Sequence, residues 1–126
     1  MAIDLIETPE AALPLGHYSQ AVAHQGTLYL SGILPVAIDG DPFAVRPFDE
    51  QADLVLAHAG AILAKAGASV ADIVKVSIYV TDISNWAGFD ARYARFVGDH
   101  KPARAVIPVP ALHHGFDIEL ELIAAV

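Results

Sequence analysis

Between Pro47 and Ala66, apolar residues recur at three- and four-residue spacing, which is the repeat of an amphipathic helix. These positions are Ala52, Val55, Leu56, Ala59, Ile62, Leu63 and Ala66. The pattern predicts a helix over 47–66, and Gly67 directly after it is typical of a helix C-terminus. Gly60 costs this helix about 1 kcal/mol relative to alanine, and we expect it to permit close packing on a sheet.

Alternation of apolar and polar residues predicts strands elsewhere. Strands are expected at 18–24 and 27–31, joined by a hairpin at Gln25-Gly26, and at 73–81, 104–109 and 116–125. In the strand at 73–81, one face carries Val74, Val76, Ile78 and Val80, and the other carries Lys75, Ser77 and Tyr79. The segment 35–46 is rich in turn residues around Asp39-Gly40, with a short strand expected on either side.

A second helix is predicted after Ser84, which we expect to cap it. Its apolar stripe consists of Trp86, Phe89, Tyr93 and Phe96. The order is therefore two or three strands, a helix, a strand, a helix and two strands, within one domain over 1–126. This order indicates an α+β fold with both helices on one face of a sheet.

The last two strands place polar groups on the face that the helices leave open. Ile118, Leu120 and Leu122 point to one side of the last strand, whereas Glu119, Glu121 and Ile123 point to the other. If the helices cover the Ile118 side, Glu119 lies on the open face. We expect Arg104, which shares a face with Val106, to lie near it.

Composition narrows the possible partners. Hydrophobic residues make up 55% of the chain, yet no uninterrupted apolar run approaches the ~18–20 residues that span a bilayer. A subunit interface is the simplest place for the excess apolar surface. The net charge of −8 disfavours nucleic acid and anionic membranes as partners. The chain has no cysteine, and residues 1–15 lack the features of a signal peptide, so we expect a cytoplasmic protein.

Arg104 can grip a carboxylate through a bidentate fork, and Glu119 can act as a general base on a water molecule. Tyr18 and Ser31 can supply hydroxyl groups to a substrate, and Gly32 is expected for backbone geometry. From spacing alone, ordinary strand residues explain these positions better than a functional site does. His113 and His114 are adjacent and lack the spacing of a metal site, so no metal is expected.

Six segments, in order and in register over nearly the whole chain, resemble the motifs of the Rid/YjgF family. They are 15–22 (LGHYSQAV), 30–35 (LSGILP), 51–67 (QADLVLAHAGAILAKAG), 72–82 (DIVKVSIYVTD), 102–104 (PAR) and 118–124 (IELELIA). The resemblance implies a chorismate-mutase-like fold and a homotrimer with the sheets inside and three clefts between subunits.

The resemblance also implies roles for individual residues. Arg104 would bind the substrate carboxylate, Glu119 would handle the attacking water, and Tyr18, Ser31 and Gly32 would line the pocket. Backbone groups near Val106 would contribute, and Asp90 stands in the pocket where the deaminases often have Asn. The implied reaction is cofactor-independent hydrolysis of small imines or enamines, such as 2-aminoacrylate, to 2-oxo acids and ammonia.

Several pocket positions depart from the family pattern, and they leave the substrate open. His17 stands where Pro is usual, Ile33 where Gln is common, and Val106 where some members carry Cys. Acidic Asp90 near the pocket would weaken carboxylate binding. The alternatives are a deaminase of a ring-cleavage product such as 2-aminomuconate, a non-catalytic ligand-binding or chaperone-like trimer, and a ribonuclease. The ribonuclease is disfavoured because the chain has no basic tract to hold phosphates.

Overall fold

A computed structural model describes residues 2–126 of the protein. Eight helices and strands build the fold: β1 (Asp4–Ile6), β2 (Ala21–His24), β3 (Thr27–Ile33), α1 (Phe48–Lys65), β4 (Ile73–Val80), α2 (Trp86–Val97), β5 (Ala103–Pro108) and β6 (Ile118–Ala125). Three short 3₁₀ turns, η1 (Val70–Asp72), η2 (Ile83–Asn85) and η3 (His113–Gly115), connect some of them.

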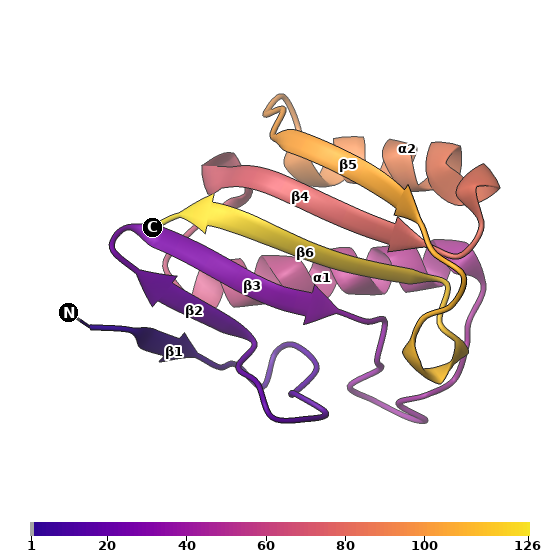
Figure 1. The fold of residues 1–126 in the computed structure, drawn as a ribbon, viewed down its shortest axis with the longest axis horizontal. Helices are drawn as coiled ribbons and strands as arrows, with labels where there is room; N and C mark the ends of the chain where they lie inside the picture. The colour runs from indigo at the N-terminus through magenta and orange to yellow at the C-terminus, as the bar shows by residue number, and fades with distance from the viewer. Residues whose placement is uncertain (1) are drawn as a thin grey trace.

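The strands form one six-stranded sheet in the order β1-β2-β3-β6-β4-β5. Only β4 and β5 run parallel to each other, and every other neighbouring pair is antiparallel. Both helices lie on the same face of this mixed sheet, α1 behind β3 and β6 and α2 behind β4 and β5 (Figure 1). The α+β fold with two helices on one face is thus confirmed.

Local sequence signals place α1 and the hairpin as predicted. The buried face of α1 includes Val55, Leu56, Ile62 and Leu63. The helix ends in a Schellman motif, in which the Gly67 and Ala68 N–H groups donate to Ala64 and Leu63 carbonyls while Gly67 takes a φ of 81°. In the β2–β3 hairpin, Gln25 and Gly26 both have positive φ, as a type I′ turn requires.

The second helix begins differently from the prediction. Ser84 does not cap α2, because it lies in η2, where its N–H and hydroxyl both donate to Asp82 Oδ1. Trp86 is 46% exposed and does not belong to the buried stripe, which Phe89, Tyr93 and Val97 form. Gly60 faces Phe96 of α2 rather than the sheet, since a Cβ at Gly60 would lie 3.6 Å from the Phe96 ring.

Two strand predictions also need correction. Between the pairs Ile73–Ala124 and Lys75–Ile123 the register shifts, and this bulge turns Val74 to solvent, away from buried Val76. The segment 35–46 contains turns but no strand. The third strand before α1 is instead β1, which the hydrophobic pattern did not reveal because it is short and mostly exposed.

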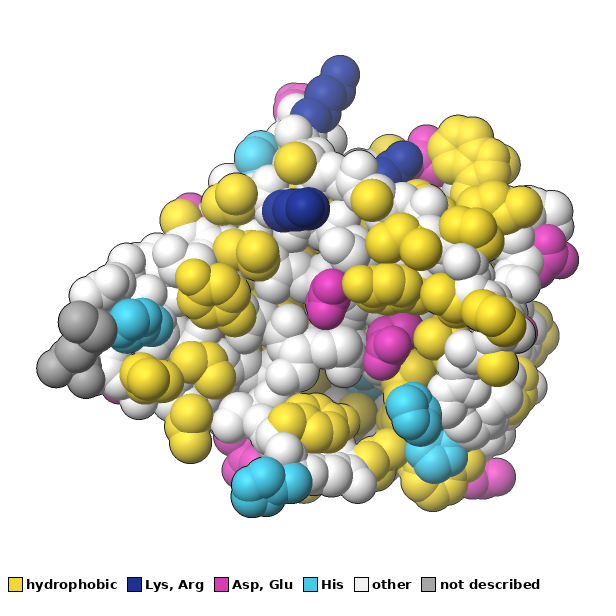
Figure 2. Space-filling model, viewed as in Figure 1, with side chains coloured by type: hydrophobic (Ala, Val, Ile, Leu, Met, Phe, Trp, Pro, Cys, Tyr) yellow, Lys and Arg dark blue, Asp and Glu magenta, His cyan; other side chains and the backbone are white. Residues whose placement is uncertain are grey.

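The sheet face opposite α1 and α2 is not covered by either helix (Figure 2). Ile118, Leu120 and Leu122 are buried under the helices, so Glu119, Glu121 and Ile123 lie on the uncovered face, as predicted. In register with Ile123, Tyr29 of β3 is 49% exposed on the same face. Within residues 2–126, neither helix combines the length and the apolar character needed to cross a bilayer.

Candidate active site

Glu119 and Gly32 meet where β3 and β6 lose their regular register. Between the pairs Leu30–Leu122 and Ile33–Leu120, β3 has one residue more than β6, and the resulting bulge contains Ser31 and Gly32. A Cβ on Gly32 would lie 2.8 Å from Glu119 Oε2, closer than such atoms approach. Glycine therefore gives the Glu119 carboxylate the space it occupies.

Glu119 and Glu121 lie on the same face, but their carboxylates differ in their partners. The Tyr79 hydroxyl donates a hydrogen bond of 2.8 Å to Glu121 Oε1, whereas Glu119 accepts no hydrogen bond from the described residues. Burial raises the pKa of Glu119, and the nearby charge of His113 opposes this shift. Glu119 is thus the glutamate that is free to bind and deprotonate a water molecule.

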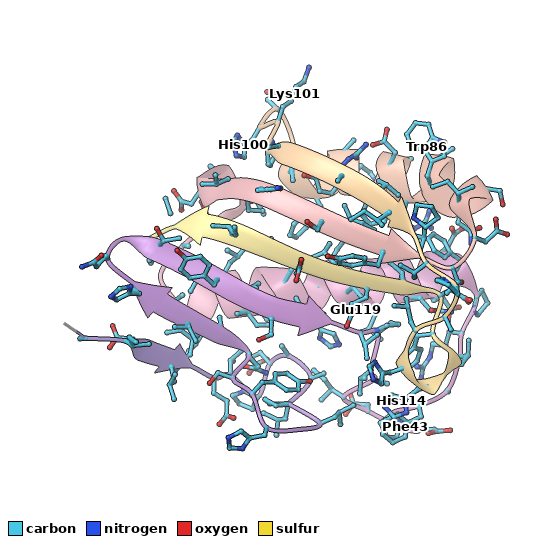
Figure 3. The ribbon with its side chains drawn as sticks, viewed as in Figure 1. Phe43, Trp86, His100, Lys101, His114 and Glu119 are labelled. Atoms are coloured by element: carbon cyan, nitrogen blue, oxygen red, sulfur yellow. The ribbon has the colours of Figure 1, made fainter. Side chains whose placement is uncertain are left out.

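A cavity of about 380 Å³ opens beside Glu119, whose position on the sheet is labelled in Figure 3. Tyr18, Ser31 and Gly32 line this cavity together with Glu119. The Ser31 hydroxyl donates 2.6 Å to the Ser19 carbonyl, and the Tyr18 hydroxyl accepts a 3.3 Å hydrogen bond from the Leu15 N–H. The structure therefore brings four predicted site residues together within one chain.

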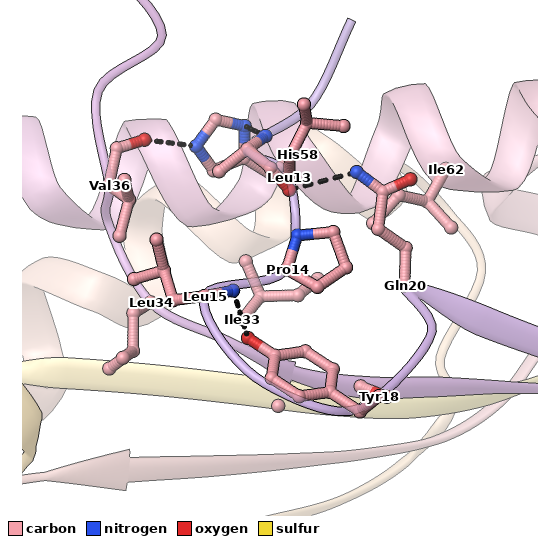
Figure 4. Close-up of a pocket in the computed structure, with 13 residues that line it drawn as sticks. Leu13, Pro14, Leu15, Tyr18, Gln20, Ile33, Leu34, Val36, His58 and Ile62 are labelled. Carbon is pink, nitrogen blue, oxygen red and sulfur yellow. Dashed lines mark hydrogen bonds between the residues drawn. The ribbon is translucent and has the colours of Figure 1, made fainter. Parts of the chain in front are cut away.

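Buried polar side chains hold the segment that carries Tyr18 against α1 (Figure 4). His58 Nδ1 accepts from the Ala12 N–H at 3.4 Å, and Nε2 lies 2.7 Å from the Val36 carbonyl, so Nε2 carries the proton. The Gln20 amide exchanges hydrogen bonds with both backbone groups of Thr8. A cavity of about 40 Å³ lies between these side chains and Tyr18.

Arg104 lies in a second cavity, of about 470 Å³, at the β5 edge of the sheet. Its Nη1 donates to Asp90 Oδ1 of α2 at 2.5 Å, and its guanidinium lies 5.0 Å from the centre of the Tyr93 ring. Tyr93 is 6% exposed, and its buried hydroxyl has no hydrogen-bond partner within residues 2–126. The cavity thus contains a guanidinium, the side-chain group that suits a carboxylate ligand.

The expectation that Arg104 lies near Glu119 is wrong for a single chain. Arg104 pairs in register with Val76, which is buried under the helices, whereas Glu119 pairs with Tyr79 on the open face. Residues paired across neighbouring strands point to the same side, so the two side chains lie on opposite faces of the sheet. Val106 pairs with Ile78, faces the helices and packs partly buried against the core.

His113 and His114 also line the Glu119 cavity, which sequence reasoning did not detect. They lie in η3, six and five positions before Glu119 in the chain, and reach the cavity because the chain turns before entering β6. The only available signal was their position just before the closing motif. In the part of the chain described, no cluster of three His, Asp or Glu side chains has the arrangement of a metal site.

Comparison with known proteins identifies the family of the chain. A family model described as Endoribonuclease L-PSP matches residues 8–126. A RutC family protein of Pyrococcus abyssi is 35% identical over 124 residues, covering 98% of each chain. The chain belongs to the Rid/YjgF family. The resemblance seen in the six motifs is thereby confirmed.

Two further Rid/YjgF relatives bear on structure and activity. A crystal structure from Yersinia pestis, described as a protein of unknown function of the conserved Rid protein family YyfA, superposes with a TM-score of 0.95. It is 36% identical and covers 99% of this chain and 100% of its own. A protein of Dermatophagoides farinae named 2-iminobutanoate/2-iminopropanoate deaminase is 29% identical, with 97% of this chain and 95% of that protein covered. The family thus includes proteins named as deaminases of small imino acids.

Proposed function

We propose that this Rid/YjgF protein hydrolyses small imines of 2-oxo acids, and their enamine tautomers, to the 2-oxo acids and ammonia. The observation that carries the proposal is the Glu119 carboxylate, which lines a cavity, accepts no hydrogen bond from the described residues and has a raised pKa. A carboxylate of raised pKa is a better base towards water than an ordinary exposed one. The relative named as an imino acid deaminase supports the same chemistry.

The reaction consumes one imine and one water molecule. Glu119 takes a proton from the water as the water oxygen attacks the imine carbon, and the electrons of the C=N bond move to nitrogen. The resulting carbinolamine collapses when its nitrogen is protonated, the C–N bond breaks and the hydroxyl proton leaves. Tyr18 and Ser31 are placed to orient the substrate or the water in the same cavity.

Arg104 is the proposed carboxylate anchor, although it lies on the other face of the sheet in this chain. A second copy that presents its Arg104 cavity to the Glu119 cavity of the first would complete the site. We therefore propose a homotrimer whose clefts combine Glu119, Tyr18 and Ser31 of one subunit with Arg104, Asp90 and the backbone near Val106 of its neighbour. Tyr29, which is exposed on the uncovered sheet face, supplies apolar surface for such an assembly.

The test is ammonia release from imines that an amino-acid oxidase generates from several amino acids, with the uncatalysed rate subtracted. Wild type should accelerate the release without added metal or cofactor. Arg104→Ala should lose about 2–5 kcal/mol of transition-state binding, which is about 30-fold to several-thousand-fold in kcat/KM. Glu119→Gln should lower kcat by ~10²-fold or more. No acceleration by the wild-type protein would contradict the proposal.

A non-catalytic ligand-binding trimer would bind imino or oxo acids without turnover in this assay, and a 2-aminomuconate deaminase would prefer that larger substrate. The family description names an endoribonuclease, but the net charge of −8 disfavours a phosphate backbone as ligand. We propose the cytoplasm as the site of action, where enamines escape from enzymes that form them.

A further inference from the structure

The Glu119 cavity contains two imidazoles that the reaction described above does not use. His113 and His114 come from η3 and line the same cavity as Glu119, Tyr18 and Ser31. Figure 3 shows His114 beside Phe43, away from the labelled Glu119 at the centre of the sheet. Both histidines are exposed, so they lie at the solvent side of the cavity.

The turn that carries the two histidines is held in a defined conformation. His114 adopts a left-handed backbone with φ of 61°, which is uncommon for a residue other than glycine. Its ring stacks on Phe43 with 4.4 Å between centroids and meets the edge of buried Phe116 at 6.0 Å. These contacts hold the ring of His114 against Phe43 and Phe116, and His113 precedes it in the same turn.

The charged groups around Glu119 indicate different roles for His113 and His114. His113 favours the ionised form of Glu119, whereas Glu121 on the same strand disfavours it, which together with burial raises the pKa of Glu119. Tyr79 of β4 is bound to Glu121. Among the groups within residues 2–126 that shift the pKa of Glu119, His113 is the one whose charge favours the carboxylate.

We propose that His113 is the second proton-transfer residue of this site and donates a proton to the imine nitrogen while Glu119 takes a proton from the water. This role rests on the proposed deaminase function, and it assigns His114 only the support of the turn. Imine hydrolysis needs such a donor, because the nitrogen must gain protons before it leaves as ammonia. Imidazole is the side chain that exchanges protons near neutral pH.

The proton transfers balance over one turnover. In the first step the water oxygen bonds to the imine carbon, Glu119 accepts one water proton, and the His113 imidazolium protonates the nitrogen. In the second step protonated Glu119 gives its proton to the amino group, neutral His113 accepts the hydroxyl proton, and the C–N bond breaks as the C=O bond forms. Ammonia leaves, and both side chains return to their starting protonation states.

The decisive experiment is the pH profile of kcat/KM for 2-iminopropionate in wild type, His113→Gln and His24→Gln. His24 lies beside the β2–β3 turn and lines neither the Glu119 cavity nor the Arg104 cavity, so its variant controls for the loss of one histidine. Wild type should show a bell-shaped profile, since Glu119 must be ionised and His113 protonated. His113→Gln should lower kcat by ~10²-fold and lose the alkaline limb, whereas His24→Gln should keep both.

Two further measurements separate a proton-transfer role from a structural one. Added imidazole should restore part of the activity of His113→Ala but leave Glu119→Gln inactive. By carboxyl-detected NMR, the pKa of Glu119 should rise in His113→Gln, a result that does not depend on turnover. A wild type that is inactive on every imine contradicts the deaminase function itself. An active wild type whose His113→Gln variant keeps its rate and alkaline limb overturns the role of His113 alone.

Discussion

Gly32 is the residue whose missing side chain most directly shapes the site. A Cβ at this position would lie 2.8 Å from Glu119 Oε2 and 3.1 Å from its Cδ. The carboxylate is the flexible end of a side chain, so it would move aside at little cost to the fold. In its new position, however, the Glu119 carboxylate would no longer be aligned to take the proton of the attacking water.

Gly32→Ala should therefore lower kcat by roughly 10- to 100-fold, because a displacement of the catalytic group by about 1 Å has effects of this size. The denaturation midpoint should change little. Gly88→Ala is the matched control, since its Cβ would meet only Asp49 Oδ1 at an ordinary 3.6 Å. Equal kcat values for Gly32→Ala and wild type would show that the position of Glu119 is not critical.

Asp90 determines how much positive charge Arg104 offers to a ligand. The ion pair between the two side chains is 2.5 Å long and partly exposed. Asp90→Asn removes the competing charge but keeps the shape, so carboxylate binding should strengthen. A partly exposed pair is worth about 0.5–1 kcal/mol, which corresponds to a KM for 2-iminopropionate lower by about two- to five-fold.

The control for Asp90→Asn is Asp39→Asn, which removes one exposed carboxylate with no hydrogen bond among the described residues. Its KM should equal that of wild type. A higher KM in Asp90→Asn would show instead that Asp90 serves to orient the Arg104 fork. Either shift would be read from initial rates of ammonia release at several substrate concentrations.

Elements with strong local signals were predictable from the sequence, and those shaped by tertiary contacts were not. Helix α1 has a long apolar repeat and a glycine stop, and the β2–β3 hairpin has a residue pair suited to its turn. The bulges at Val74 and at Ser31–Gly32 arise from pairing with β6, a strand far away in the sequence. The alternation of polar and apolar residues carries no signal for an extra residue in one strand.

The same distinction applies to the site. Glu119 could be placed on the open face because β6 alternates regularly, and the family motifs indicated Tyr18 and Ser31. Arg104 was placed near Glu119 because the sequence does not specify on which side β5 presents its odd and even residues. That choice depends on the parallel register between β4 and β5. His113 was missed because no spacing rule links a turn to a neighbouring strand.

His58 joins α1 to the two loops that border the Glu119 cavity, and its chemistry predicts a dependence of stability on pH. Burial lowers the pKa of His58, although its hydrogen bond to Val36 opposes the shift. The unfolded chain therefore binds a proton more readily than the folded one. Stability is unaffected by this group well above the ordinary histidine pKa of about 6.5 and falls as the pH drops below it.

His58→Gln should accordingly be less stable than wild type at pH 7.5 by about 1–3 kcal/mol, because buried backbone groups lose their partner. Its stability should fall less than that of wild type between pH 7.5 and 5.5. His17→Gln, which changes an exposed histidine, should keep the wild-type dependence. Urea unfolding at several pH values gives both comparisons, and parallel curves for wild type and His58→Gln would contradict the assignment.

The molecule as a whole has a well-packed helical face and a sheet face that no helix covers. On the uncovered face, apolar side chains such as Tyr29 accompany the acidic centre formed by Glu119 and Glu121. The Arg104 cavity opens on the other side of the same sheet. A site that uses both Arg104 and Glu119 therefore needs two chains, and the proposed trimer provides three such sites.

The most direct test of this account is activity in mixed assemblies of two inactive variants. Arg104→Ala and Glu119→Gln chains with different tags would be co-expressed and purified by both tags, and their mass measured by light scattering. In a ring of three, every mixed assembly contains one site with both residues intact, so about one third of wild-type activity per trimer should return. Mixed trimers that stay as inactive as either parent would contradict a site shared between subunits.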